Sequence, residues 1–286
     1  MTLDVDDIRL ESAESGPETG VSRIRDDVSV VASGKGGVGT STVAALLALG
    51  FAGQGRSTLV VDAASTPGSL PLLLDAPEAS GFLATRGTGR DPSDLAEAVT
   101  PNLSLIAFDG LDRGLRRVSR GRRTAGFRRL SSAYDEFDAT VIDAGARLDA
   151  VWSACSAGAG RLLAVTGPER IAVAANYGLL KTMETRVPRL PLEVLVNRRS
   201  GNAARGVFSP LRSAVDYFLH RSVGFAGAVP RDQELRERVD GGASLQDLTE
   251  NSAAAHAARR IATRILTEMD GSAGSASPVP SPPGRS

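Results

Sequence analysis

The feature that most constrains this chain is the segment at residues 33–42, Ser-Gly-Lys-Gly-Gly-Val-Gly-Thr-Ser-Thr. An apolar, strand-forming run precedes it at residues 28–32, and a helix-forming run follows at residues 43–51. Glycines between a strand and a helix let successive backbone amides curl around phosphate oxygens, and the helix adds the positive end of its dipole. The pattern predicts a phosphate-binding loop (P-loop) made of Gly34, Lys35, Gly36, Gly37, Val38, Gly39, Thr40, Ser41 and Thr42.

One residue of the usual loop is missing. Gly34 and Gly39 keep the spacing G-x-x-x-x-G, and the Ser41 hydroxyl stands where Mg²⁺ is ligated. The lysine expected before that serine is Thr40. Only two of the 33 lysines and arginines in the chain are lysines, so a basic residue placed by drift would almost always be arginine. Random drift therefore does not explain the lysine at position 35. At position 40, threonine replaces the expected lysine without conserving its charge.

The segment Lys-Gly-Gly-Val-Gly, with its lysine at position 35, resembles the deviant Walker A loop of the MinD/ParA family of P-loop ATPases. In that family this lysine reaches across a dimer interface to the partner's nucleotide, and a second lysine, here Thr40, holds the protein's own phosphates. The resemblance implies ATP or ADP with Mg²⁺ as cofactors, a nucleotide-dependent homodimer and a catalytic role for Lys35. Because Thr40 is uncharged, it also implies a degenerate P-loop.

Apolar, strand-like runs alternate with helical runs along the rest of the chain. Strands apolar on both faces, separated by helices, predict an α/β fold with one doubly wound, mainly parallel sheet and helices on both faces. The resemblance implies the same fold, the SIMIBI/MinD type of P-loop NTPase. The predicted strands are residues 28–32, 57–61, 103–108, 139–142, 162–166, 192–196 and 223–229, and the helices include residues 172–186 and 203–219.

The composition of the two ends differs from that of this body. Residues 1–26 are rich in acidic residues, serine and glycine, and residues 271–286 contain little besides glycine, serine, alanine and proline. Such segments bury too little apolar surface to fold alone. The predicted organisation is a flexible N-terminal arm at 1–26, a MinD/ParA-like domain at 27–270 and a disordered tail at 271–286.

Two of the predicted strands are followed directly by an aspartate. Asp62 follows the second strand and Asp143 the fourth, so both carboxylates are expected at the sheet edge where ligands bind. The resemblance assigns Ser41, Asp62 and Asp143 to Mg²⁺ and gives Asp62 a catalytic role. The carboxylate that positions the attacking water in the family would stand at position 64, which is Ala64. Taken alone, Asp62 could also be an aspartate that caps the next turn.

Two later strand ends match the purine side of the family's site. The resemblance assigns Asn197 to the adenine edge, and Pro230 and Asp232 to a segment whose backbone flanks the base. An asparagine after a strand is also an ordinary turn residue.

The second half resembles one branch of the family, the flagellar regulators called FlhG, FleN or YlxH. Stretches at residues 163–169, 196–198, 223–225 and 251–266 carry this resemblance, which with the P-loop covers residues 28–268. The segment Asp-Gln-Ala-x-x-Leu-Arg, by which such proteins stimulate a partner GTPase, does not occur in the N-terminal arm.

Charge and cysteine content exclude several other classes of protein. The net charge is zero, which gives no global reason for binding nucleic acid or anionic lipid. A cluster of arginines from Arg113 to Arg129 could contact the phosphates of DNA or an anionic membrane, although a solvated helical face is favoured. The longest apolar run falls short of the roughly 20 residues of a membrane span. The single cysteine, Cys155, excludes a multi-cysteine cluster within one chain and is expected to be a buried hydrophobe.

Together these features predict a MinD-like, nucleotide-binding regulator of the placement or number of a cellular structure, with the flagellum favoured. It would bind a protein of a polar or flagellar assembly, with impaired ATP hydrolysis, in the cytoplasm or peripherally at a pole or membrane through that partner. One alternative is an active MinD/ParA-type ATPase in which Lys35 or an arginine supplies the missing charge. Another is a ParA-like DNA-partition factor or a CpaE/TadZ-like pilus-assembly factor. The sequence leaves open whether ATP is hydrolysed, because positions 40 and 64 lack the family's groups.

Overall fold

The computed structural model describes residues 24–64, 69–76, 91–108, 120–248 and 252–274. Within these residues the strands form one eight-stranded sheet in the order β3-β4-β2-β5-β1-β6-β7-β8. Neighbouring strands run parallel except β3, which pairs antiparallel with β4. The strands are β1 (Arg25–Ala32), β2 (Thr58–Asp62), β3 (Glu97–Thr100), β4 (Leu103–Ala107), β5 (Ala139–Gly145), β6 (Ala159–Thr166), β7 (Leu192–Asn197) and β8 (Gly224–Val229).

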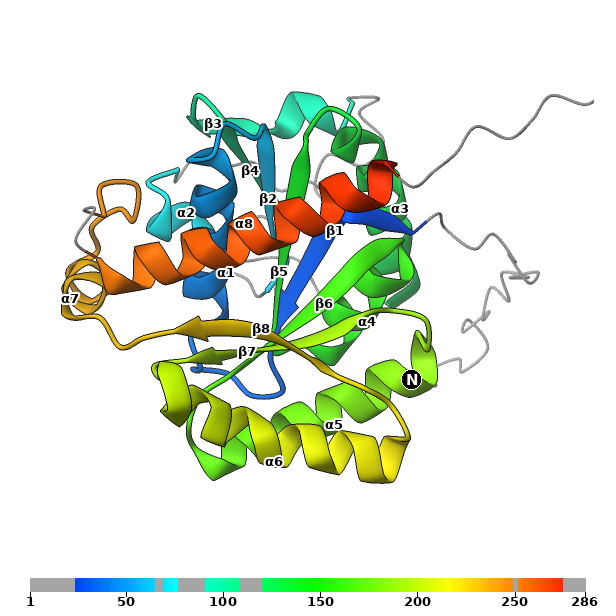
Figure 1. The fold of residues 1–286 in the computed structure, drawn as a ribbon. Coiled ribbons are helices and arrows are strands. Elements are labelled where there is room, and N and C mark those ends of the chain that lie inside the picture. The colour runs from blue at the N-terminus through cyan, green and yellow to red at the C-terminus, as the bar shows by residue number, and fades with distance from the viewer. Residues whose placement is uncertain (1–23, 65–68, 77–90, 109–119, 249–251, 275–286) are drawn as a thin grey trace, which may run out of the picture.

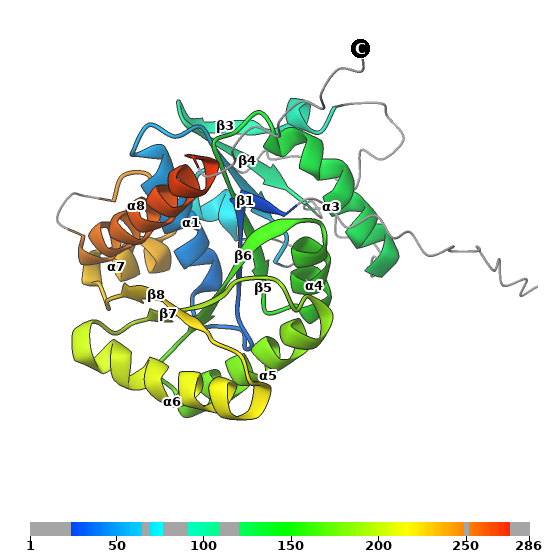
Figure 2. The same ribbon diagram turned by 45° about the vertical axis from the view of Figure 1, so that its right-hand side comes forward.

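Helices cover both faces of this sheet. They are α1 (Thr40–Ala52), α2 (Leu70–Leu73), α3 (Arg120–Tyr134), α4 (Leu148–Ser156), α5 (Arg170–Arg186), α6 (Gly201–Leu219), α7 (Gln233–Gly241) and α8 (Ala253–Gly274), with a short 3-10 helix, η2 (Ser93–Leu95), before β3. Helices α1, α2 and α8 pack on one face, and α3, α4, α5 and α6 pack on the other (Figures 1 and 2).

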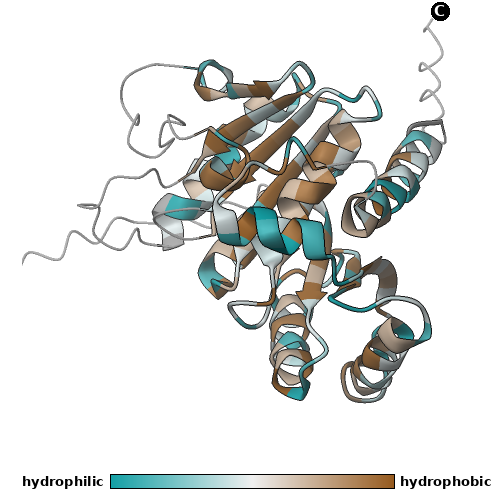
Figure 3. Ribbon diagram, turned by 90° about the vertical axis from the view of Figure 1, so that its left-hand side faces the viewer, coloured by the Kyte–Doolittle hydropathy of each residue, from teal (hydrophilic) through white to brown (hydrophobic). Residues whose placement is uncertain are grey.

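The sheet separates two apolar cores, because successive side chains of a strand point to opposite faces. In β1, Val28, Val30 and Ala32 pack toward α4 and α5, whereas Val31 packs toward α1 and α8. Since helices cover both faces, the central strands are apolar at consecutive positions. Figure 3 shows these strands as a hydrophobic centre between helices with polar outer faces.

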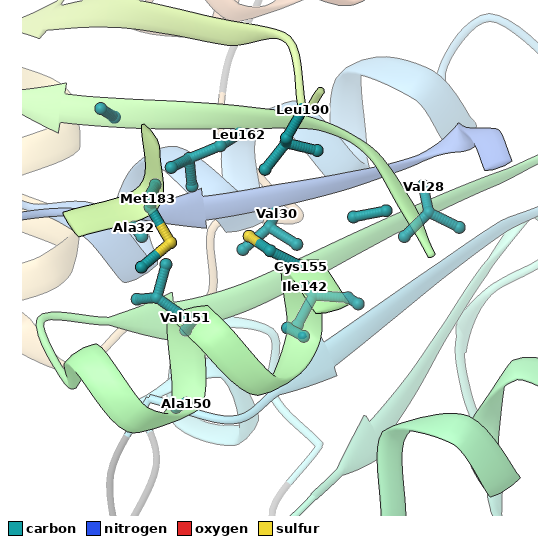
Figure 4. Packing of buried hydrophobic residues seen from close by; sticks show 14 of the residues in the cluster. Val28, Val30, Ala32, Ile142, Ala150, Val151, Cys155, Leu162, Met183 and Leu190 are labelled. Atoms are coloured by element: carbon teal, nitrogen blue, oxygen red, sulfur yellow. The ribbon is translucent and has the colours of Figure 1, made fainter. Parts of the chain in front are cut away.

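Figure 4 shows part of the core on the α4 and α5 side of the sheet. Cys155 of α4 lies beside Val30 and Ile142, and Met183 of α5 lies near Leu162. Burial raises the pKa of the Cys155 thiol above its usual value. The cysteine is therefore an apolar core residue, as its isolation in the sequence indicates.

The predicted α/β fold is confirmed, and all the predicted strands are present. The strand that sequence reasoning missed is β3, whose four residues are half-buried or exposed. Its stabilisation comes from antiparallel pairing with β4 rather than from an apolar pattern of its own.

The ends of the body differ slightly from the predicted boundaries. β1 begins at Arg25, inside the predicted arm, because the Arg25 amide donates to the Gly158 carbonyl at 2.8 Å. α8 continues to Gly274, inside the predicted tail, and an ion pair of 2.6 Å between Arg56 and Asp270 holds its last turns. Residues 1–23 and 275–286, which make up the rest of the predicted arm and tail, lie outside the described residues.

Candidate functional site

The P-loop lies at the carboxyl edge of the sheet, in the connection between β1 and α1. β1 is central, with β5 and β6 as its neighbours, so the ends of three parallel strands meet at this loop. The Ser33 amide donates to the Gly145 carbonyl at 2.8 Å, which joins the start of the loop to the end of β5. Asp62 and Asp143 are partners in the register of β2 and β5, so both carboxylates reach this edge, as predicted.

The outer rim of the P-loop is open. Gly37 and Gly39 have left-handed backbone angles, with φ of 81° and 88°, which favour glycine. A Cβ added at Gly36 or Gly37 would meet nothing within 4 Å. The Lys35 side chain is exposed, and its Nζ donates to the Gly36 carbonyl at 3.1 Å. Lys35 therefore lies at the surface of the loop and makes no contact with the chain's own strand-end carboxylates among the described hydrogen bonds and ion pairs.

Thr40 closes the loop from the inside. Its side chain is buried, and its hydroxyl donates to Ser33 Oγ at 2.9 Å. The Ser33 hydroxyl in turn donates to the Lys35 carbonyl at 2.9 Å. This chain of hydrogen bonds, the Thr40 relay, turns the polar groups of positions 33 and 40 toward the loop's own backbone.

The other side of the loop is held by a buried asparagine of α5. Asn176 Oδ1 accepts a hydrogen bond from the Gly34 amide at 2.7 Å, and its Nδ2 donates to the Val165 carbonyl at 2.8 Å. The approach is so close that a Cβ at Gly34 would lie 2.1 Å from the carbonyl oxygen of Ala175. Gly34 is thus needed for packing against α5, whereas the outer glycines leave space for a ligand.

Asn197 and Arg198, after β7, hold the far end of the loop. Asn197 Nδ2 donates to the Val38 carbonyl at 2.8 Å, and its Oδ1 accepts from the Arg198 amide at 2.9 Å. The Arg198 guanidinium donates to the Gly37 carbonyl at 2.9 Å, from a backbone with φ of 63°. The Asn197 side chain therefore holds the P-loop at this end.

The predicted metal ligands lie together, but they differ in their surroundings. Asp143 is fully buried; its Oδ1 accepts from the Gly145 amide at 3.0 Å, and its Oδ2 has no hydrogen-bond partner among the described residues. Burial raises the pKa of Asp143 to about 7, and the neighbouring Asp62 carboxylate also raises it, while the Ser41 hydroxyl and the Gly145 amide lower it. A buried carboxylate oxygen without a donor fits a hard cation such as Mg²⁺.

Asp62 has a structural role as well. Its two carboxylate oxygens accept hydrogen bonds from the Leu70 amide at 2.9 Å and the Ala64 amide at 3.3 Å. It therefore holds the turn after β2, which was the alternative to metal binding. The Ala64 side chain is buried, and a Cβ at Gly145 would lie 2.9 Å from its Cβ. Position 64 thus faces the end of β5 with a methyl group.

A cavity of about 400 Å³ lies beside the P-loop, between the start of α1 and the loops after β7 and β8. It brings together five of the residues predicted to bind nucleotide: Gly39, Thr42, Asn197, Pro230 and Asp232. The Asp232 carboxylate is occupied, because it accepts hydrogen bonds from the Leu235 and Ala254 amides and from the Ser252 hydroxyl. Partial burial raises the pKa of this carboxyl, but these hydrogen bonds outweigh burial and keep it below its usual value. Asp232 consequently caps α7 and α8 and shapes the cavity wall.

Sequence reasoning missed three residues that hold the loop. Ser33 belongs to the motif but has no fixed role in it, and Asn176 lies in a helix without any local signal. Arg198 follows Asn197 directly and could have been noticed as a cation near the site. Their roles depend on contacts between segments far apart in the chain.

Of the arginine cluster, the structure describes the side chains of Arg123, Arg128 and Arg129, and these differ in exposure. Arg123 is 1% exposed, and its Nε lies 3.5 Å from the Asp149 carboxylate. Arg128 is exposed and Arg129 is half-buried, whereas Arg113, Arg116 and Arg117 lie outside the described residues. No described helix combines the length and apolar character needed to cross a bilayer.

Comparisons with known proteins agree with this geometry. Residues 25–100 match the ParA family model, described as "NUBPL iron-transfer P-loop NTPase". The chain is 26% identical over 242 residues to the antiactivator FleN of Pseudomonas aeruginosa, which covers 83% of this chain and 85% of FleN.

Two solved structures show the same fold. A chain of the MinC:MinD cell division protein complex of Aquifex aeolicus aligns with a TM-score of 0.66 at 20% identity, over 89% of this chain and 98% of that one. The septum site-determining protein MinD of Pyrococcus horikoshii, complexed with Mg-ADP, aligns with a TM-score of 0.65 at 22% identity, over 85% of this chain and 96% of that one. The predicted resemblance to the MinD/ParA proteins and to FleN is confirmed, and the fold matches that of the MinD/ParA P-loop NTPases.

We expect Gly34→Ala to destabilise the domain, because the new Cβ would collide with backbone atoms of α5. Overpacking of this kind costs about 1 to 3 kcal/mol. Gly36→Ala is the matched control, since a Cβ there enters open space. Urea unfolding of both variants measures the difference, and equal midpoints would contradict the close contact between the P-loop and α5.

The raised pKa of Asp143 predicts a specific pH dependence of stability. The folded protein holds this proton up to about pH 7, whereas the carboxyl of the unfolded chain releases it near the ordinary aspartate pKa of 3.8. The free energy of unfolding should therefore fall as pH rises from about 4 to about 7, by an amount on the order of a few kcal/mol.

Asp143→Asn should remove this fall, so the variant should be more stable than the wild type above pH 7 in EDTA without nucleotide. Denaturant unfolding from pH 4 to pH 8 tests this, with Asp247→Asn as a control at an exposed carboxylate. Parallel stability profiles for Asp143→Asn and wild type would show that ionisation of the buried Asp143 carboxyl does not lower the free energy of unfolding.

Proposed function

We propose that this protein is a nucleotide-binding regulator of the placement or number of a cellular structure, with the flagellum favoured. The similarity to FleN over most of the chain supports the branch, and the fold of MinD supports the nucleotide site. The protein acts by binding a partner of a polar or flagellar assembly, and it holds ATP or ADP with Mg²⁺ weakly. It works in the cytoplasm, or peripherally at a pole or membrane through that partner.

The observation that carries this proposal is the Thr40 relay. A lysine at position 40 would place a cation in the loop, whereas Thr40 donates its hydroxyl proton to Ser33 and keeps the loop closed on itself. Losing one charge-assisted phosphate contact costs about 1.5 to 3 kcal/mol, a factor of roughly 10 to 150 in affinity. The domain therefore keeps the fold of a nucleotide switch but binds nucleotide with reduced affinity.

Each of the remaining residues of this site has a separate role in the proposed function. The open rim at Gly36 and Gly37 offers backbone amides to phosphate, and the cavity beside it accepts the nucleoside. Ser41 and Asp143 would hold Mg²⁺, which neutralises phosphate charge when bound. Ala64 leaves no carboxylate to orient an attacking water, so hydrolysis is impaired independently of binding. The exposed Lys35 is available to a second copy of the chain in a nucleotide-dependent homodimer.

Thr40→Lys should raise the affinity for ATP by about 10- to 150-fold, because it restores the charged phosphate contact. Thr40→Gln is the matched control, since it also loses the threonine hydroxyl but brings no charge. Calorimetric titration with Mg-ATP compares the two variants. Equal affinities for Thr40→Lys and Thr40→Gln would show that charge at this position does not limit binding.

Hydrolysis should require a second change. Thr40→Lys alone should stay slow, Ala64→Asp alone should do little, and the double variant should gain turnover, since binding and water orientation act as a unit. Phosphate release under saturating ATP measures this. Full activity of Thr40→Lys alone would mean that a residue other than position 64 positions the water.

The contact between Arg198 and the P-loop favours an active ATPase as the second candidate. Arg231 and Arg236 also line the cavity, but the Arg198 guanidinium donates to the Gly37 carbonyl of the P-loop itself, so Arg198 is the candidate to supply the missing charge. In that case wild-type protein hydrolyses ATP, and Arg198→Ala lowers affinity for ATP about tenfold or more without changing affinity for adenosine. Arg199→Ala is the control, because its side chain bonds to the Arg198 carbonyl rather than to the loop. Equal losses for ATP and adenosine would indicate a structural role only.

Two other functions receive less support. A DNA-partition or pilus-assembly role through the arginine cluster is weakened by the burial of Arg123. An iron-transfer role, which the name of the family model mentions, would need exposed cysteine ligands, and the single cysteine of this chain is buried in the core.

A further inference from the structure

The strand β8 leaves one edge of the sheet open. It pairs with β7 and with no other strand among the described residues. Figures 1 and 2 show it as the outermost strand at that end, between α8 and α6. Its sequence, Gly-Phe-Ala-Gly-Ala-Val, has no charged residue or proline, which are the usual guards against pairing with another chain.

A groove of about 350 Å³ runs along this edge. Four consecutive residues of β8, from Phe225 to Ala228, form its floor. The start of α6 forms one wall with Arg205, and α8 forms the other with Arg260, Ile261 and Arg264. The groove therefore combines an unpaired strand with two helical walls, and it lies next to the nucleotide cavity, with Pro230 lining both.

The charged residues that line this groove are all positive. Three arginines and no carboxylate line it. Arg264 is neutralised by ion pairs of 2.5 Å with Glu193 and with Glu268. Arg205 stacks over the Phe225 ring at 5.4 Å, and neither it nor Arg260 has an ion-pair partner among the described residues. Both are exposed, so two positive charges face each other across the open strand edge.

We propose that this groove binds an acidic, extended peptide segment of a partner protein, which adds a strand to the free edge of β8. The backbone groups of the edge supply main-chain hydrogen bonds, and alternate side chains of the added strand reach the walls. Acidic side chains on that strand would meet Arg205 and Arg260. The site is independent of the P-loop, so the proposal stands whether or not nucleotide binds.

The geometry favours a peptide over a nucleic acid as the occupant. A nucleic acid would use the positive charges, but it has no backbone N–H and C=O ladder to pair with a strand edge. The Phe225 ring is already covered by Arg205, which leaves no free aromatic face for base stacking. The register shift between Val194 and Leu195 leaves Ala226 as the extra residue of a β-bulge in β8, so an added strand is expected to pair before and after Ala226 with an interruption at that residue.

Binding can be measured with a fluorescent octapeptide of alternating glutamate and valine, titrated into the full chain. Three comparison probes are the lysine and valine octapeptide, the acidic octapeptide N-methylated at alternate amides, and a short DNA duplex. We expect the acidic peptide to bind most tightly, with N-methylation weakening it by about tenfold or more. Hydrogen exchange of residues 224–229 should slow when the acidic peptide is added.

Charge reversal tests the walls of the groove. Arg205→Glu combined with Arg260→Glu should weaken acidic-peptide binding about tenfold or more, because both contacts become repulsive. The matched control is Arg212→Glu combined with Arg259→Glu, which makes the same charge change at exposed positions of the same helices outside the groove. Circular dichroism of both double variants verifies that they fold.

Several results would overturn the proposal. Equal weakening by the two double variants, or equal affinity for the N-methylated peptide, would reduce the effect to general electrostatics without strand pairing. Tighter binding of the DNA duplex would make nucleic acid the occupant. Slow exchange of residues 224–229 that depends on protein concentration without peptide would make a second copy of the chain the occupant.

Discussion

Hydrogen bonds within the P-loop fix the conformation of this loop, which lies at the centre of the domain. Thr40, Ser33 and the Lys35 carbonyl form a closed chain on the inside of the loop, and Asn176 and Asn197 hold it at both ends. Buried polar groups are costly unless paired, so these contacts stabilise one loop conformation without a ligand. These hydrogen bonds fix the loop from the inside, and its outer rim remains open at Gly36 and Gly37.

The same rule explains why several candidate ligand residues also hold the backbone. Asp62 secures the turn after β2, Asp232 caps two helices, and the Asn197 amide supports the loop. Asp143 is the exception, since one of its buried oxygens has no partner among the described residues. Among these carboxylates and amides, the Asp143 oxygen is therefore the one whose partner the described residues do not supply.

Much of the fold and part of the site could be predicted from local pattern. Apolar runs of strand length, separated by helices, predicted a mainly parallel sheet, because strands covered on both faces must be apolar throughout. The edge strand β3 was missed, since four half-exposed residues carry no such pattern. Of the site, Gly39, Thr42, Asn197, Pro230 and Asp232 do meet at one cavity. Their hydrogen-bond partners were not predictable, because Asn176 and Arg198 approach the loop only after the sheet has formed.

What the sequence alone determined is the set of groups available: a P-loop motif with threonine in place of lysine, alanine in place of a second aspartate, and one lysine at position 35. Only the tertiary structure decided how those groups are used. It placed Lys35 at the surface, turned Thr40 inward to Ser33, buried Arg123 and left β8 open between two unpaired arginines. The physical reason is that motif spacing follows from local backbone geometry, whereas burial and hydrogen-bond partners depend on which distant segments pack together.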